Sequence, residues 1–185
     1  MIRSYSSVFY SRQQGVGMLE VLIALLVLVI GVLGFAGLQL VALKNTGEAS
    51  HRAHATLIAQ DAIERFQSNP SQLAFYLNDD NWPVEILSSG GEPSNWKKCM
   101  DSSCTDSQMA TWDIEQLSWV ARNTLPAGLV LAKNCDFNGM QCVIVSWDGQ
   151  NPAACMGNAG VNEDAASSCL VLEVAQGEAL RRATL

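Results

Sequence analysis

A single carboxylate, Glu20, stands at the head of a long apolar run. The run Val21–Leu38 contains no charged side chain, and the next basic residue after Glu20 is Lys44. A carboxylate in such a segment is costly in lipid and is expected to have a cationic partner. Cleavage of the chain between Gly15 and Val16 would create an α-amine four residues before Glu20, about 6 Å away along a helix. The chemistry that this spacing indicates is therefore ion pairing, within one chain or between neighbouring chains.

The apolar run is long enough to cross a membrane. Eighteen or more apolar residues can span the hydrocarbon layer of about 30 Å. A secretory signal peptide has a shorter core of about 7–15 residues and a small-residue cleavage site, whereas this core continues through Gln39–Leu43. We therefore expect residues 1–15 to be a cleaved leader and residues 16–43 to form a transmembrane helix, with a plain membrane anchor as the alternative. Arg3 and Arg12 place the leader in the cytoplasm and everything after Lys44 across the membrane.

The helical pattern continues past the apolar run. Small and apolar residues recur at helical spacing up to the end of this segment, with polar residues between them. Ser68 and Asn69 precede Pro70, and a residue before proline is disfavoured in the helical region. Residues 44–68 are thus predicted to be the amphipathic half of the same helix. Its apolar positions form two rows, Ala55, Ala59 and Ile63, and Ile58, Ala62 and Phe66.

Composition supports one exported domain after this helix. The 185 residues carry 18 acidic and 11 basic side chains, a net charge of −7. Removal of residues 1–15 takes away Arg3 and Arg12 and no acid, which leaves 9 basic and 18 acidic residues and a net charge of −9. This balance does not suit nucleic-acid binding, which needs clustered basic residues. Residues 69–185 are enough for a single small core.

All six cysteines follow the apolar run. An even number of cysteines in an exported domain favours disulfides. The spacing favours pairing between neighbours, although six cysteines allow fifteen pairings. Zinc binding is the rival interpretation, but the chain has no CxxC pair. Neighbour pairing would join Cys99 to Cys104, Cys135 to Cys142, and Cys155 to Cys169.

The region after the long helix predicts an α+β fold. Residues 69–111 have the turn chemistry of a long connecting region, and Asp113 is expected to cap a helix that runs to Asn123. Three strands are predicted after it, with an Asn138-Gly139 hairpin turn between the first two and a Cys135–Cys142 bond at its base. A long N-terminal helix packed on a C-terminal antiparallel sheet results. The strands are 129–131, 142–147 and 169–174.

Other residues that could act as catalysts or ligands do not form a recognised catalytic pattern. His51 and His54 share a helix face, but the sequence pattern joins no carboxylate or cysteine to them. We therefore predict no catalytic residues, no metal site and no cofactor. A calcium site without the usual twelve-residue loop is a weaker alternative, and the tryptophans are expected in the core or in interfaces rather than in a sugar platform. The calcium candidates are Asp136, Asn138, Asn162, Glu163 and Asp164; the tryptophans are Trp82, Trp96, Trp112, Trp119 and Trp147.

The N-terminal pattern resembles the class III signal of type IV prepilins and type II secretion pseudopilins. In that family a short basic leader ends in Gly, the next residue becomes the mature N-terminus, and Glu is its fifth residue. Gly15, Val16 and Glu20 match these positions. Val16 and Gly17 depart mildly from the family, in which the first mature residue is more often Phe or Met.

The order of elements after residue 112 resembles the PilV group of minor pilins. A helix, a Leu-Pro-x-Gly turn at Leu125–Gly128, a strand, a hairpin and Val-x-Val-Ser-Trp-Asp at Val143–Asp148 carry this resemblance. It implies a minor pilin of a type IV pilus, cleaved by a prepilin peptidase and methylated at Val16. Its implied partners are other minor pilins, the major pilin and the inner-membrane assembly platform. The implied location is the inner membrane with the head in the periplasm, and then the pilus fibre.

Two alternatives share this architecture. A type II secretion pseudopilin has the same N-terminal signal and helix. A tip adhesin would expose variable loops, for which residues 78–111 and 150–168 are the candidates. In the minor-pilin interpretation, Glu20 is expected to pair with the α-amine of its own or an adjacent subunit during assembly.

Overall fold

The computed structural model describes residues 17–83, 98–162, 164 and 167–174. Its first element is one unbroken helix, α1 (Met18–Ser68). The chain divides into two compact units, Met1–Thr46 and Gly47–Leu185. We call the part of α1 up to Thr46 the apolar half and the part from Gly47 the packed half. The prediction of one long N-terminal helix is confirmed. Residue 17 precedes the helix, and residue 16 lies outside the described residues.

The packed half buries a stripe of small and apolar side chains. Alanines at spacings of three and four residues let other elements approach the helix axis closely, and Phe66 fills the core near the C-terminal end. The helix stops at Ser68 because Asn69, which precedes Pro70, has φ −132° and ψ 62°, outside the helical region. The predicted face is therefore confirmed, with Ile63 only partly buried. The buried residues of α1 are Ala55, Ile58, Ala59, Ala62 and Phe66.

The segment after α1 has more regular structure than its turn chemistry predicted. Four short helical elements occur before residue 102, so the interpretation of 69–111 as a connecting region is wrong in part. Residues 84–97 lie outside the described residues. The four elements are η1 (Pro70–Gln72), α2 (Leu73–Tyr76), η2 (Asp79–Asn81) and α3 (Lys98–Asp101).

The second long helix, α4 (Asp106–Thr124), begins seven residues before the predicted start at Asp113. A capping box causes the earlier start: the Gln108 N–H donates to Thr105 Oγ1 (3.3 Å), and the Thr105 N–H donates to Gln108 Oε1 (3.0 Å). Asp113 therefore lies inside the helix and is not its cap. The polar first turn of α4 lacks the apolar periodicity that marks a helix in sequence.

A tight turn connects α4 to the sheet. The helix ends at Thr124, and the Leu125 N–H donates to the Ala121 carbonyl at 2.9 Å. A Cβ atom on Gly128 would lie 2.2 Å from that same carbonyl oxygen. Only glycine fits this approach, so the Leu-Pro-x-Gly pattern has a steric reason.

The sheet is antiparallel with the strand order β1-β2-β5. Its strands are β1 (Leu129–Asn134), β2 (Gln141–Ser146) and β5 (Cys169–Val174), and Ile144 on β2 faces Leu131 on one side and Val171 on the other. The three predicted strands are confirmed to within three residues. The short η3 (Pro152–Cys155) and the hairpin of β3 (Met156–Gly157) and β4 (Gly160–Val161) lie between β2 and β5 in the chain.

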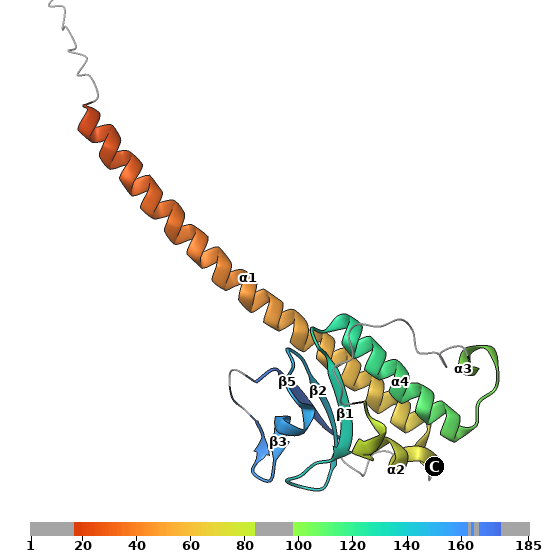
Figure 1. The fold of residues 1–185 in the computed structure, drawn as a ribbon. Helices are drawn as coiled ribbons and strands as arrows, with labels where there is room; N and C mark the ends of the chain where they lie inside the picture. The colour runs from red at the N-terminus through yellow and green to blue at the C-terminus, as the bar shows by residue number, and fades with distance from the viewer. Residues whose placement is uncertain (1–16, 84–97, 163, 165–166, 175–185) are drawn as a thin grey trace, which may run out of the picture. The chain divides into compact units, whose positions relative to one another are not determined.

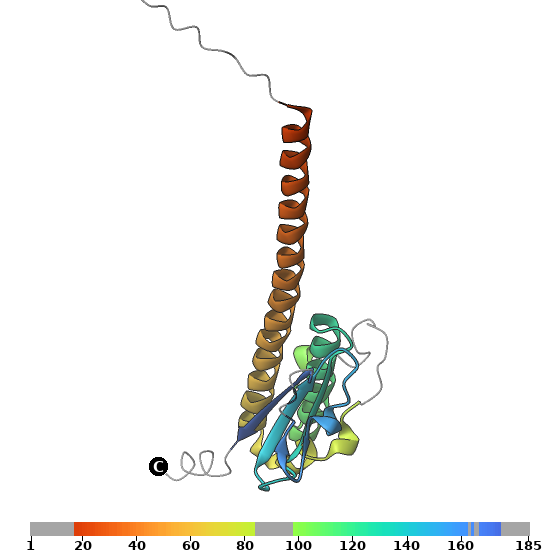
Figure 2. The same ribbon diagram turned by 90° about the vertical axis from the view of Figure 1, so that its left-hand side faces the viewer.

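One hydrophobic core joins these elements within the Gly47–Leu185 unit. Figures 1 and 2 show α4 and the packed half of α1 on the same side of the sheet. The residues of β2 from Cys142 to Ser146 are all buried, as expected for a central strand covered on both faces. Trp147, Tyr76 and Leu117 are the largest fully buried side chains. The structure thus confirms the α+β class, with a long helix packed on a C-terminal antiparallel sheet.

Candidate assembly site

Glu20 lies in the first turn of α1. Its N–H donates to the Gly17 carbonyl at 2.9 Å, and its side chain is exposed. Gly15 and Val16, the predicted cleavage and methylation residues, lie outside the described residues. The predicted ion pair between Glu20 and a new α-amine therefore stays a prediction.

The apolar half presents hydrophobic side chains on every side. Leu38 is 72% exposed, Leu33 67% and Phe35 62%. The segment is long and apolar enough to cross a membrane, and none of its most apolar window is buried within the chain. A helix that is apolar all round is stable in lipid or among other apolar helices and not in water. The exposed surface of this half is thus suited to membrane insertion and to helix bundling.

Three glycines interrupt the apolar half without breaking it. The α-helix is continuous through Gly31, Gly34 and Gly37. Within the part of the chain that the structure describes, no atom outside the helix backbone lies within 4 Å of a Cβ built on any of them. Small residues let helix backbones approach closely in apolar surroundings. These positions are therefore free to receive a neighbouring helix.

A buried polar network holds the packed half to the rest of the head. Arg65 Nη1 donates to Asp113 Oδ1 on α4 at 2.8 Å. Its Nε and Nη2 atoms donate to Asp61, one turn earlier on α1, at 3.0 and 3.1 Å. Tyr76 on α2 donates its hydroxyl to the other Asp113 oxygen at 2.5 Å. Asp113 is 4% exposed, so one buried carboxylate ties together three helices.

This environment shifts the titration of two members of the network. Burial opposes the charge on Arg65, but the hydrogen bonds to Asp61 and Asp113 outweigh it and raise the pKa of the guanidinium. Burial, followed by the hydrogen bond to Asp113, raises the pKa of the Tyr76 hydroxyl well above its usual range. The network is therefore an ion pair with a neutral tyrosine donor at neutral pH. It is a structural clamp in which both oxygens of Asp113 are already engaged.

The sequence contained a signal for this clamp that the cap prediction missed. Asp113 lies at helical spacing with Ala110, Ile114 and Leu117, all of which face the core. A carboxylate on an apolar helix face must have a partner when it is buried. The partner, Arg65, is 48 residues away in the chain. No local spacing reveals such a pair.

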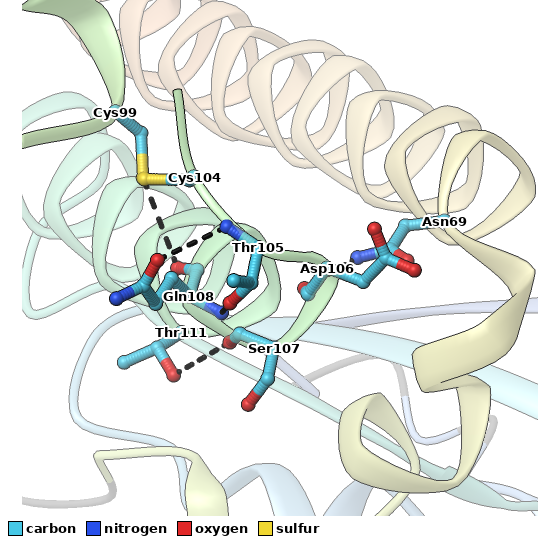
Figure 3. The surroundings of a disulfide bond; sticks show 8 residues. All are labelled: Asn69, Cys99, Cys104, Thr105, Asp106, Ser107, Gln108 and Thr111. Atoms are coloured by element: carbon cyan, nitrogen blue, oxygen red, sulfur yellow. Dashed lines mark hydrogen bonds between the residues drawn. A yellow bond between two sulfur atoms is a disulfide. The ribbon is translucent and has the colours of Figure 1, made fainter. Parts of the chain in front are cut away.

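Three disulfides connect neighbouring cysteines, as the spacing favoured. Cys99–Cys104 immediately precedes the capping box of α4, where Asn69 Nδ2 also donates to the Asp106 carbonyl at 2.8 Å (Figure 3). Cys135–Cys142 closes the base of the hairpin between β1 and β2, with Gly139 at φ 69°. Cys155–Cys169 joins η3 to the start of β5. Each bond constrains a connection between core elements.

The five residues predicted as alternative calcium ligands make separate contacts or lie outside the described residues. Asp136 forms an ion pair with Lys133 at 2.7 Å, and the Asn138 amide donates to Glu173 at 3.0 Å. Asn162 Oδ1 accepts a hydrogen bond from the Asp164 N–H at 3.1 Å, and Glu163 lies outside the described residues. These contacts are local turn and strand-edge interactions. They do not bring the five calcium candidates into one described site.

The tryptophans also differ in their surroundings. Trp147 and Trp82 are buried in the core, and Trp82 Nε1 donates to the Tyr76 carbonyl at 2.7 Å. Trp112 and Trp119 are half-buried on α4, and the Arg65 guanidinium lies 5.4 Å from the Trp112 ring centroid. Trp96 lies outside the described residues. The core assignment thus holds for two of the five.

The two histidines of α1 have different surroundings. His54 is exposed on α1, whereas His51 lies beside Glu48 and beside Asp148, which comes from the turn after β2. Sequence spacing could not reveal the contact with Asp148, because Asp148 is 97 positions further along the chain than His51. Among the described residues, this cluster brings two carboxylates beside a histidine to which the sequence pattern assigned none.

Comparison with known proteins gives one family. Residues 37–115 match the model of the Tt1218-like family, described as Type IV pilin Tt1218. No curated protein and no solved structure matches the chain. The matched range covers the end of the apolar half, all of the packed half and the first half of α4. Together with the long apolar helix packed on an antiparallel sheet, this match supports the recognition of the chain as a type IV pilin.

Proposed function

We propose that this pilin is a minor subunit that takes part in type IV pilus biogenesis, in a priming or tip complex with other minor pilins. The observation that carries the proposal is Glu20 in the first turn of a helix half whose hydrophobic side chains are exposed on every side. A structural subunit of this kind needs no catalytic centre. Its activity is to add an apolar helix to a bundle and to present a folded head.

The chemistry of assembly follows from the helix. Cleavage after Gly15 would leave the α-amine of Val16 one helical turn from Glu20. As the apolar half leaves lipid and enters a bundle of similar helices, both charges enter a dry environment. An unpaired charge there costs several kcal/mol, whereas a paired one costs far less. Glu20 therefore favours the register in which an α-amine of its own or a neighbouring subunit lies beside it.

The expected test is incorporation of Glu20→Ala into sheared fibres. Removal of the carboxylate should reduce incorporation at least 10-fold, because a penalty of about 3 kcal/mol exceeds one factor of ten. The unfolding of the head should not change, because Glu20 lies outside the Gly47–Leu185 unit. Glu64→Ala is the matched control, since Glu64 is an exposed carboxylate on the packed half of the same helix. Normal incorporation of Glu20→Ala would contradict the proposal.

Processing is tested separately by intact mass and N-terminal sequencing of the protein from its native membrane. An N-methylated Val16 is the expected start. A mature chain that begins at Met1 would leave Glu20 without the proposed partner and would refute the pathway.

Deletion of the gene distinguishes the pilus from a secretion pseudopilus. The family match favours a pilus role, so we expect fewer surface fibres and unchanged secretion of exoproteins. Loss of secretion with normal piliation would assign the chain to a secretion system instead. Complementation with the Glu64→Ala variant should restore fibres, and complementation with Glu20→Ala should not.

A further inference from the structure

A histidine and two carboxylates converge on one side of the head. Glu48 and His51 are three residues apart on α1, so they share a face of the helix. Asp148 reaches them from the turn that follows β2. One potential ligand atom from each of the three side chains lies within 4.8 Å of the other two.

The turn that presents Asp148 is held in place by the core. Asp148 has φ 55° and the next residue, Gly149, has φ 76°, so both adopt the left-handed conformation of a tight turn. The Asp148 N–H donates to the Pro126 carbonyl at 2.7 Å, and the preceding Trp147 is fully buried. The backbone of Asp148 is thus anchored, while its carboxylate is exposed and free to turn.

His51 supplies an independent observation. Its Nδ1 atom is buried and has no hydrogen-bond partner among the residues that the structure describes. A buried polar atom without a partner is costly and calls for an explanation. A cation held by the imidazole and the two carboxylates would give this ring a polar partner, because a neutral imidazole nitrogen is a good metal ligand.

The local charge also favours a cation. Arg52 forms an ion pair with Glu48 at 3.0 Å, in which both side chains are more than 40% exposed. Arg52 also donates to the Ser167 carbonyl at 3.1 Å and lies 5.4 Å from the Trp147 ring centroid. These two contacts hold Arg52 independently of its ion pair with Glu48. Two carboxylates and one guanidinium leave one net negative charge for a divalent ion.

We propose that Glu48, His51 and Asp148 bind a divalent transition-metal ion of the Zn²⁺ class. One imidazole and two carboxylates form a three-ligand set that zinc accepts, with water in the fourth position. Ligand atoms around tetrahedral zinc lie about 3.3 Å apart at bond lengths of about 2.0–2.1 Å. The three side chains would therefore close on the ion by rotations about their side-chain bonds. Calcium and magnesium prefer sets made only of oxygen, so the histidine selects against them.

Such an ion would fasten the packed half of α1 to the turn after β2. Within the Gly47–Leu185 unit it would add a connection between α1 and the rest of the head, at the opposite end of the packed half from the Arg65–Asp113 pair. This inference is independent of the role of the chain in a priming complex.

The test is zinc titration of the full chain, purified in detergent and stripped of metal, by calorimetry with a competing chelator of known affinity. The unchanged protein should bind one Zn²⁺ with an affinity at least 10-fold higher than for Ca²⁺ or Mg²⁺, and excess Zn²⁺ should raise its melting temperature. His51→Gln and Asp148→Asn should each weaken zinc binding at least about 10-fold. Asparagine tolerates the left-handed backbone at position 148, so the second variant keeps the turn.

His54→Gln is the matched control. It makes the same substitution one helical turn away, at an exposed histidine outside the cluster, and it should leave zinc affinity unchanged. All variants should melt within a few degrees of the unchanged protein in chelator. The absence of saturable 1:1 zinc binding would overturn the proposal, and so would equal affinity in His51→Gln and His54→Gln or tighter binding of Ca²⁺ than of Zn²⁺.

Discussion

The two halves of α1 share one backbone and differ in what stabilises them. The packed half buries Ala55, Ala59 and Ala62 completely, and its Arg65 enters the polar network around Asp113. The apolar half buries none of its large hydrophobic side chains; Met18, at its beginning, is 87% exposed. The packed half therefore obtains its partners from its own chain. The apolar half must obtain them from lipid or from other helices.

This difference explains why the amphipathic pattern appears only after residue 44. A helix on a water-soluble head needs one apolar stripe, because its other faces meet solvent. A helix in lipid or in a helix bundle needs no polar face. Glu20 is the exception in the apolar half, since no other charged side chain occurs between it and Lys44. A substitution in the packed half should consequently change the stability of the head. A substitution of a similar residue in the apolar half should change the contacts with lipid or with other helices.

The largest expected effect on stability is at Phe66 in the packed half, and Phe35 in the apolar half is the control. Phe66 is 5% exposed, and its ring centroid lies 4.5 Å from that of Tyr76. Phe66→Ala should lower the free energy of unfolding of the head by about 3–5 kcal/mol, because it removes buried surface and leaves a cavity. Phe35→Ala, at a position 62% exposed, should leave that value unchanged. Urea titration of the full chain in detergent, followed by tryptophan fluorescence, measures both. A similar loss in the two variants would mean that the halves are not energetically distinct.

The second prediction concerns the polar clamp of the packed half. Asp113→Ala should lower the free energy of unfolding by about 3 kcal/mol, because Arg65 loses a buried partner and the Tyr76 hydroxyl loses its acceptor. Asp113→Asn should cost less, since it keeps an oxygen for Tyr76. The same urea titration applies, with Glu64→Ala as an exposed control on α1. If Asp113→Ala and the control had the same free energy of unfolding, the network would not hold the helices together.

The smallest expected effect is at the start of α4. Thr105→Ala should destabilise the head by about 1 kcal/mol, the usual value for the loss of an N-cap. Thr105→Ser keeps the hydroxyl and should stay within a few tenths of a kcal/mol of the unchanged protein. Hydrogen exchange of the first-turn amides of α4 should rise in Thr105→Ala alone. Unchanged exchange would show that the nearby Cys99–Cys104 bond, and not the cap, holds this end.

Local sequence patterns predicted much of this architecture. The apolar run, the Ala and Ile rows of the packed half and the Pro70 stop are local signals of one helix, and α1 follows them. The Asn138-Gly139 turn and the spacing of Cys135 and Cys142 likewise predicted the first hairpin. These signals succeed because helix periodicity, proline sterics and tight-turn chemistry act over a few residues.

The start of α4 and the short helices after α1 were not predictable in the same way. Asp113 has the residue type of a cap, and only the Thr105–Gln108 capping box and the core beneath Ala110 show that it lies inside the helix. Turn-forming residues in 69–83 are compatible with both loops and short helical turns. Packing against α4 and the core decides between them.

The sequence by itself determined that this chain has an apolar helix headed by one carboxylate, followed by a cysteine-stabilised α+β head. Both properties follow from residue order, because hydrophobicity and helical period are local. Only the tertiary structure decided that Asp113 pairs with Arg65 and that Asp148 lies beside Glu48 and His51. Those contacts join residues 48 or more positions apart, and such distances close only when the sheet and the two long helices bury a common core.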